Sequence, residues 1–334
     1  MAADGLAFPR DFGAHPASRI EWWYVTGSLE ASARLWGFQI TLFRAATGIS
    51  GSAGRFSADQ LVFAHAAISD LAQARLRHDQ RIARRGFGIA DASTENTDVF
   101  VRGWRLERDG GDGLSRYRAI AASESGGFRF DLVLEATQPV LLQGADGFSR
   151  KGPNPLQSSR YYSEPQLAVR GTLGLDRDEP VNVRGRAWLD HEWSDSLLGA
   201  SAVGWDWVGM NLDDGAALMA FRVRRADGTT LWTGGSFRAA AGPTQNFAAA
   251  GVSFHAGRRW TSPASRASYP VEWSVVTPAG CFDVKAMLDD QELDSRASTG
   301  SIYWEGIAQL FDADGRKVGR GYLEMTGYAA PLAW

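Results

Sequence analysis

The chain has 334 residues, of which 44% are hydrophobic and 22% are charged, and its formal net charge is -3. These values are ordinary for a globular protein with a sizeable buried core. A slightly negative chain has no global positive field, which excludes recruitment of nucleic acid or anionic lipid by charge alone. Nucleic acid is therefore not an expected partner.

The aromatic content is high, with 13 Trp, 17 Phe and 8 Tyr. Such a load suits wide β-surfaces or an apolar cavity. Cys281 is the single cysteine, which excludes an intrachain disulfide and a cysteine metal cluster. No run is apolar enough to span a membrane, and residues 1–4 carry no hydrophobic signal segment. That start fits either a natural beginning or a chain whose signal peptide was removed.

Strand patterns fill the first half of the chain. After an extended arm over residues 1–18, the segment RIEWWYVTGSL at 19–29 alternates Trp22 and Tyr24 on one face with Trp23 on the other. Apolar groups on both faces predict a strand that is covered on both sides. Further strands are predicted at 35–44, 60–68, 99–107, 117–123, 127–135, 161–171, 172–175 and 183–189.

The basic, Gln-rich segment 71–85 is instead interpreted as a short surface helix. The second half repeats the strand pattern, with strands predicted at 217–224, 230–238, 270–277, 281–288, 300–312 and 319–328. Sustained 3.6-residue periodicity is almost missing. The sequence therefore predicts an all-β architecture with many closely spaced strands, as in barrels or sandwiches.

An internal echo indicates two related halves. The segment WWYVTGSLE at 22–30 can be laid on WDWVGMNLD at 205–213, and each is followed by an apolar strand that ends in arginine, at Arg44 and Arg224. We place the domain boundary at the turn after residue 175. The predicted domains are residues 1–176 and 177–334.

The richest stretch for chemistry is 185–214, GRAWLDHEWSDSLLGASAVGWDWVGMNLDD. It mixes acidic side chains and one histidine with indoles: Asp190, His191, Glu192, Asp195 and Asp206 among Trp188, Trp193, Trp205 and Trp207. Two interpretations compete. The stretch forms either the polar end of an apolar pocket or a structural corner whose polar groups tie down backbone.

Strand alternation restricts the choice of residues within this stretch. If residues 188–193 are extended, His191 and Trp193 share one face, whereas Asp190 and Glu192 share the other. His191 with Trp193 is the better pair for a barrel lumen, because the two acids are more easily left near solvent. By the same rule, Asp206 points away from its neighbouring tryptophans.

Several segments together carry a family resemblance. His15-Pro16 and RIEWWYVTG at 19–27, continued by the segments at 38–39, 63–65, 161–163 and 188–193, resemble the signature of AttH-like proteins and carotenoid 1,2-hydratases (hydroxyneurosporene synthases). The resemblance covers nearly the whole chain. It implies two tandem lipocalin-like antiparallel β-barrel domains. It also implies that some members add water across a terminal isoprenoid double bond without a cofactor.

The resemblance also implies candidate residues and partners. His191 and Trp193 match a His-x-Trp pair of the hydratases, but the strand LMAFR at 218–222 lacks their downstream Tyr-x-Asp pair, and Asp206 is the nearest replacement. Related fungal lipocalin-like proteins are similar to enzymes that hydrate or cyclise apolar natural products. AttH-like members resemble extracytoplasmic components encoded with an ABC-type export system, which implies a periplasmic or other extracytoplasmic location and a membrane-associated transport partner. A cytoplasmic location stays open.

Hydration of an alkene defines what the site needs. A carboxylic acid must protonate the double bond, aromatic faces must stabilise the cation, and a base must accept a proton from water. We assign catalysis to His191, Asp206 and Glu192. The residues expected to contact ligand are Trp22, Tyr24, Gln39, Tyr161, Tyr162, Trp188, Trp193, Trp205 and Trp207.

Simpler roles stay open for the same residues. His191 could be hydrogen-bonded to a neighbouring strand, Asp206 could pair an arginine, and His65 fits a satisfied core histidine. The sequence has no nucleotide-binding or zinc-protease motif and only five scattered histidines, so neither cofactor nor metal is expected.

The leading hypothesis is an enzyme of the hydro-lyase type that binds a hydrophobic, isoprenoid-like molecule and hydrates, isomerises or cyclises it. The alternative is a non-catalytic carrier of a hydrophobic ligand that serves an extracytoplasmic transport system. The sequence does not determine an oligomeric state.

Overall fold

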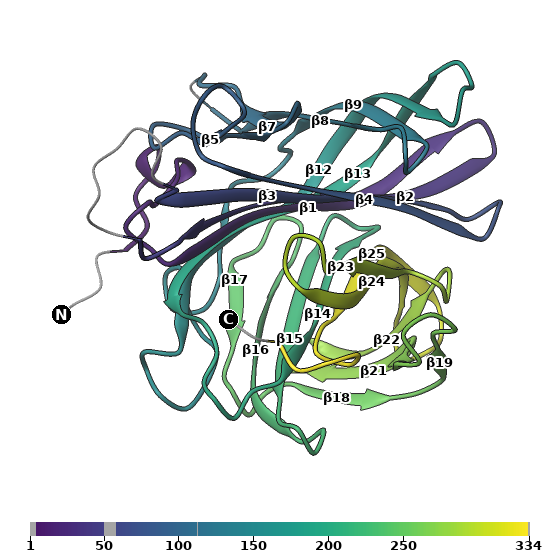
Figure 1. Ribbon diagram of the computed structural model, residues 1–334. Helices are drawn as coiled ribbons and strands as arrows, with labels where there is room; N and C mark the ends of the chain where they lie inside the picture. The colour runs from purple at the N-terminus through teal and green to yellow at the C-terminus, as the bar shows by residue number, and fades with distance from the viewer. Residues whose placement is uncertain (1–4, 50–57, 112, 333–334) are drawn as a thin grey trace.

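The computed structural model describes residues 5–49, 58–111 and 113–332. Within these ranges the chain is built of antiparallel strands, with one 3₁₀ turn, η1 (Arg10–Phe12), and no α-helix. The strands form two large sheets that lie one over the other (Figure 1). The predicted all-β class and the two tandem lipocalin-like barrel domains are confirmed. No helix in the described ranges has the length and apolarity needed to cross a membrane.

The first sheet contains the strands from residue 20 to residue 196, and it curls into a nearly closed barrel. Its strands are β1 (Ile20–Ala31), β2 (Arg34–Ala46), β3 (Gln60–Asp70), β4 (Arg75–Arg84), β5 (Ala90–Ala92), β6 (Asp98–Val101), β7 (Trp104–Arg108), β8 (Arg116–Ser123), β9 (Phe128–Glu135), β10 (Leu141–Leu142), β11 (Phe148–Arg150), β12 (Ser158–Leu175) and β13 (Val181–Ser196).

The second sheet begins at residue 204. Its strands are β14 (Gly204–Leu212), β15 (Ala217–Arg224), β16 (Thr230–Arg238), β17 (Thr244–Phe247), β18 (Ser253–Ala256), β21 (Glu272–Thr277), β22 (Gly280–Ala286), β23 (Glu292–Ser295), β24 (Ser301–Phe311) and β25 (Lys317–Met325). The short strands β19 (Arg259–Thr261) and β20 (Ser268–Pro270) pair only with each other.

The two sheets share one strand order. In each, the first strand lies between the second strand and the last: β1 between β2 and β13, and β14 between β15 and β25. The echoed segments 22–30 and 205–213 fall on β1 and β14, so they occupy equivalent places in their sheets.

The predicted boundary at 176/177 falls inside the first sheet. Strand β13 pairs with both β1 and β12, so the first sheet continues to Ser196. The turn after β12 is a hairpin between two long strands, with Asp176 in a left-handed conformation (φ 52°). The change of sheet comes in the segment 197–203. The stretch 185–214 therefore belongs to both sheets.

The predicted helix at 71–85 is wrong. Residues 75–84 form β4, which pairs with β3 at one end of the first sheet. The polar residues that suggested a solvated helix face are side chains of this end strand. Arg77 is buried and donates to the Asp176 carboxylate at 2.7 Å.

Both faces of β1 are covered, as predicted. Trp23 and Val25 pack in the core of the first barrel, whereas Tyr24 joins an aromatic cluster with Tyr161 and Trp207 from the other side. This second cluster lies where β1 and β13 contact β25 and β14 of the second sheet. The interface between the sheets is thus an apolar layer of its own.

Candidate active site

A cavity of about 110 Å³ lies in the interface between the two sheets. Aromatic and acidic side chains dominate its wall, with contributions from both halves of the chain. The lining residues are Trp22, Tyr24, Thr41, Phe43, His65, Lys151, Tyr161, Asp190, Glu192, Leu197, Leu198, Trp205, Trp207, Phe221, Val223, Thr299, Ser301, Tyr303, Glu305, Glu324, Thr326 and Leu332.

Strand β13 presents its acids to this cavity. Asp190 and Glu192 line it, whereas Leu189 and Trp193 pack inside the first barrel. The alternation predicted for this segment is therefore present. The hollow, however, lies outside the barrel, between the sheets, because large apolar side chains fill the barrel interior.

Asp190 is held by neutral donors. It accepts hydrogen bonds from the Tyr161 hydroxyl at 2.7 Å, from Ser163 Oγ at 2.5 Å and from Trp188 Nε1 at 2.6 Å. Burial raises the pKa of Asp190 to about 7, although these hydrogen bonds act to lower it and the charge of Glu192 adds to the rise. Asp190 thus titrates near neutral pH.

Glu192 has a cationic partner. Lys151 Nζ lies 2.8 Å from Glu192 Oε1, and Ser159 Oγ also donates to this carboxylate. The ammonium of Lys151 sits 4.7 Å from the centre of the Tyr161 ring and 4.3 Å from that of Phe221. Among the described residues that line the cavity, Lys151 is the only lysine or arginine.

The second sheet contributes a pair of carboxyl groups. Glu305 on β24 lies directly opposite Glu324 on β25, and both line the cavity. Burial, followed by the charge of Glu324, raises the pKa of Glu305 well above its ordinary value. Burial likewise raises the pKa of Glu324 to about 7. The charge of one carboxyl group disfavours ionisation of the other, so the pair retains a proton more readily than an isolated carboxyl group.

The Glu305 side of the cavity has polar atoms without partners. Glu305 is 3% exposed and Tyr24 is 5% exposed. Glu305 Oε1 and the Tyr24 hydroxyl have no partner with good hydrogen-bond geometry within the described part of the chain, although the hydroxyls of Tyr24 and Tyr303 lie near enough to Glu305 to act against the rise of its pKa. A buried polar atom without a partner costs free energy, so such an atom at a cavity wall is available to a ligand.

His65 is satisfied and neutral. Its Nδ1 and Nε2 lie 2.9 Å from the Tyr303 hydroxyl and from Ser298 Oγ. Burial lowers the pKa of His65 to about 3, so the ring is neutral across the physiological range. His65 borders the cavity but links the two sheets structurally.

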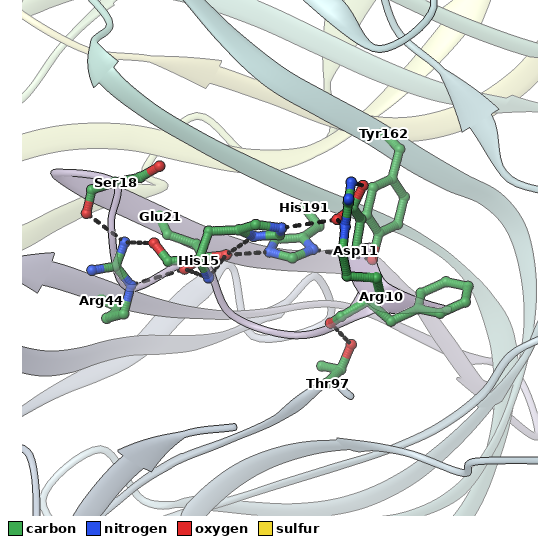
Figure 2. Close-up of polar contacts among 10 residues, drawn as sticks. Arg10, Asp11, His15, Ser18, Glu21, Arg44, Thr97, Tyr162 and His191 are labelled. Carbon is green, nitrogen blue, oxygen red and sulfur yellow. Dashed lines mark hydrogen bonds and ion pairs between the residues drawn. The ribbon is translucent and has the colours of Figure 1, made fainter. Parts of the chain in front are cut away.

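His191 points into the first barrel, into a cluster centred on Glu21 (Figure 2). The Glu21 carboxylate accepts hydrogen bonds at 2.8 Å from His191 Nε2, from His15 Nδ1, from the His15 backbone N–H and from Arg44 Nε. Burial acts to raise the pKa of Glu21, but the hydrogen bonds from His15 and His191 outweigh it, so the pKa lies well below its ordinary value. Burial lowers the pKa of His191.

Aromatic rings enclose this cluster. The His15 ring stacks on Trp193, with centroids 3.6 Å apart, and His191 stacks on Trp23 at 4.5 Å. His15, Glu21 and His191 are the nearest approach to a metal-ligand set among the described residues, with their ligand atoms within 4.8 Å of one another. The Glu21 carboxylate is already neutralised by Arg44 and bonded to both imidazoles, so this donor set fits a hydrogen-bonded centre better than a metal site.

Asp206 also lies away from the cavity. It accepts from Arg222 Nε at 2.6 Å and from the Tyr328 hydroxyl at 2.8 Å, and Arg224 Nε is 3.1 Å away. Its neighbours Trp205 and Trp207 line the cavity from the opposite face of β14, in line with the predicted alternation. The arrangement matches the simpler role in which Asp206 pairs arginines.

The structure thus divides the predicted site residues into two groups. Those that line the cavity are Glu192, Trp22, Tyr24, Tyr161, Trp205 and Trp207. Those that do not are His191, Asp206, Gln39, Tyr162, Trp188 and Trp193. Gln39 bonds Thr41, and Trp188 lies behind Asp190 as its donor.

Several cavity residues were missed from the sequence, namely Asp190, Lys151, Tyr303, Glu305 and Glu324. A signal existed for the last two, because each is a single acid within an apolar strand, in WEGI at 304–307 and LEM at 323–325. A carboxyl group in such a strand must be paired or functional.

Comparison with known proteins agrees with this fold. The AttH-like family profile matches residues 2–328. The crystal structure of a Nitrosomonas europaea protein assigned as an AttH has 47% sequence identity to this chain and a TM-score of 0.90, with 98% of each chain covered. None of the curated proteins matches this chain.

Two more distant structures share the fold alone. Kievitone hydratase from Nectria haematococca has 16% identity and a TM-score of 0.73, covering 98% of this chain and 94% of that one. CghA, in its structure with Sch210972, has 11% identity and a TM-score of 0.55, covering 96% of this chain and 90% of that one.

Proposed function

Because the chain belongs to the AttH-like family, we propose that it binds an apolar, isoprenoid-like small molecule between its two sheets and adds water across a carbon–carbon double bond without a cofactor. The observation that supports this most is the Glu305–Glu324 pair in an aromatic cavity. Protonation of an alkene needs an acid that keeps its proton at neutral pH, and the raised pKa of Glu305 meets this need.

The catalytic roles are divided between the wall of the cavity formed by the second sheet and the wall formed by β13. Glu305 transfers its proton to one alkene carbon, whose π electrons form the new C–H bond and leave a carbocation on the neighbouring carbon. The faces of Trp205 and Trp207 stabilise that cation, each by about 0.5–2 kcal/mol when well placed. A water oxygen then bonds to the cation, and Glu192 accepts the proton that this water loses. Glu192 then releases that proton to solvent and Glu305 takes one up from solvent, so both groups are restored and the sum is the addition of one water.

This assignment keeps Glu192 and replaces the other two predicted catalytic residues. His191 and Asp206 do not reach the cavity, and the acid role passes to Glu305. If Glu192 instead removes a C–H proton from the cation, the product is an isomer. A non-catalytic carrier is the second candidate function, because the aromatic walls alone would hold such a ligand.

The test uses acyclic isoprenoids and carotenoid precursors in water enriched in heavy oxygen, with mass spectrometry of the extract. We expect a product with one heavy oxygen from the wild type. We expect Glu305→Gln to lower its rate by about 10²–10⁴-fold, the usual contribution of a general acid. Tryptophan fluorescence measured in parallel reports ligand binding by both proteins.

Asp206→Asn is the matched control, since it also neutralises a buried acid of the second sheet. We expect its rate per folded molecule to stay within about tenfold of the wild type, because Asp206 is outside the cavity. Equal loss in both variants would contradict the assignment. Fluorescence quenching without any product in the wild type would replace hydration by the carrier function.

A further inference from the structure

We infer that His191 is a positioning residue. It belongs to the Glu21 cluster, which consists of His15, Glu21, Arg44 and His191 and fixes β1 and β13 from inside the first barrel. The side chains on the opposite faces of these two strands are thereby held at the cavity. This inference rests on the proposed function only for the importance of the cavity. It gives the His-x-Trp element a role that does not require contact with a ligand.

The first step of the argument is alternation on neighbouring strands. On β13, His191 lies between the cavity residues Asp190 and Glu192. On β1, Glu21 directly precedes the cavity residue Trp22. His191 and Glu21 are therefore each one peptide unit away from a side chain that lines the cavity, and each points to the other face of the same sheet.

The second step is the position of these strands in the sheet. Strand β13 is bonded on one side to β1, where Trp23 faces His191, and on the other to β12, where Tyr162 faces His191. The Tyr162 hydroxyl lies 3.1 Å from His191 Nδ1. Tyr162 is next to Tyr161, which donates to Asp190. The hydrogen bonds inside the barrel thus cross the same three strands whose outer faces build the first wall.

The third step is the number of hydrogen bonds that the Glu21 carboxylate accepts. Both oxygens of Glu21 are occupied, and Arg44 also donates at 2.9 Å to the His15 carbonyl and at 2.8 Å to that of Ser18. His191 and Glu21 are fully buried. Arg44 Nη1 is buried without a hydrogen-bond partner, but the Glu21 carboxylate and both ring nitrogens of His191 are bonded. A buried carboxylate with both oxygens bonded has few alternative arrangements. The strands therefore have little freedom to shift at this point.

The experiment compares two substitutions on the inner face of β13. His191→Leu removes the link to Glu21, whereas Leu189→Ala removes core packing two residues away and leaves the cluster intact. The readout is the titration midpoint of Asp190 in the free protein, followed by carbon NMR of labelled aspartate carboxyl groups. Its resonance is identified by its loss in Asp190→Asn.

We expect His191→Leu to lower the Asp190 midpoint by about half a pH unit or more, because a looser β13 admits water to a carboxyl group whose pKa is raised mainly by burial. The groups that face Asp190 are Tyr161, Ser163, Trp188, Glu192 and Glu324. His191→Gln retains an N–H donor toward Glu21 and should restore most of the midpoint. Leu189→Ala should lower Tm but leave the titration midpoint of Asp190 unchanged.

An unchanged midpoint in a folded His191→Leu protein would overturn the inference, and so would an equal shift in Leu189→Ala. If His191→Leu does not fold, Tyr162→Phe decides, since it removes only the hydroxyl that contacts His191 Nδ1. Tyr162→Phe is then expected to lower the Asp190 midpoint by a smaller amount. An unchanged midpoint in Tyr162→Phe would contradict the inference. No substrate is needed, so a failure of the proposed hydration leaves this test independent.

Discussion

Glu21 and Glu305 are both buried carboxyl groups on strands, with 0% and 3% exposure, yet their surroundings move their pKa values in opposite directions. Glu21 is met by an arginine, two imidazoles and a backbone N–H. Glu305 faces another carboxyl group and has an oxygen without a partner. Both groups are buried, so the difference in hydrogen-bond donors and neighbouring charges sets the direction in which each pKa shifts. The first arrangement holds a negative charge in place, and the second holds a proton.

The largest effect should come from removing the cation of the Glu21 cluster. Arg44→Met leaves a buried carboxylate without its ion-pair partner, and we expect a loss of about 3–5 kcal/mol in the free energy of unfolding. Urea denaturation measures it. Arg170→Met, which breaks the exposed pair with Glu135, is the control and should cost about 0–1 kcal/mol. Similar losses in the two variants would show that burial does not distinguish these pairs.

The pH dependence of stability should separate the two kinds of carboxyl group. The folded-state pKa values of Asp190 and Glu324 are raised to about 7, so their contribution is present at acid pH and is lost as pH rises from about 4 toward 7. Each proton difference is worth up to about 1.4 kcal/mol per pH unit. Glu21 acts with the opposite sign, because its depressed pKa makes its contribution disappear as pH falls below about 4.5.

The buried, neutral His65 acts in the opposite sense below about pH 6.5, because its lowered pKa makes its contribution grow as pH rises. Unfolding free energies are therefore compared between the wild type and a variant at about pH 5, 6, 7 and 8. Relative to the wild type, the double variant Asp190→Asn, Glu324→Gln should gain stability as pH rises over this range, since neither amide titrates and His65 is common to both proteins. A difference between the two proteins that does not change with pH would contradict the raised pKa values of Asp190 and Glu324.

The smallest expected effect is an increase in the free energy of unfolding. Glu305→Met replaces a buried carboxyl group, whose Oε1 has no partner, by an apolar side chain of similar length, and we expect about 1 kcal/mol of added stability near pH 8. Thermal unfolding at that pH measures it, with Glu135→Met on the surface as control. A clear loss of stability would mean that Glu305 has structural partners after all.

Much of the fold followed from periodicity. The alternation in residues 19–29 predicted a strand covered on both faces, and β1 has one face in each of two apolar clusters. Alternation also separated the two faces of 188–193 correctly. The end strand β4 was mistaken for a helix, because its polar composition carried no period that distinguishes a strand from a helix.

The candidate site was less accessible to sequence reasoning. Alternation shows which residues share a face, but the hollow face is set by how the second sheet packs on the first. That is why His191 was favoured over Asp190, although only Asp190 lines the cavity. Pairing of Glu305 with Glu324 depends on the register between β24 and β25, which local patterns do not encode.

The common strand order of the two sheets has a consequence for symmetry. A cavity between two identical subunits would have to carry the same residues on both walls. Here both walls belong to one polypeptide, so one can carry the Lys151–Glu192 ion pair while the other carries Glu305 and Glu324 without a cation. Because the two similar halves are covalently linked, the two walls of one cavity can differ, whereas a single cavity on a twofold axis would carry two copies of every residue.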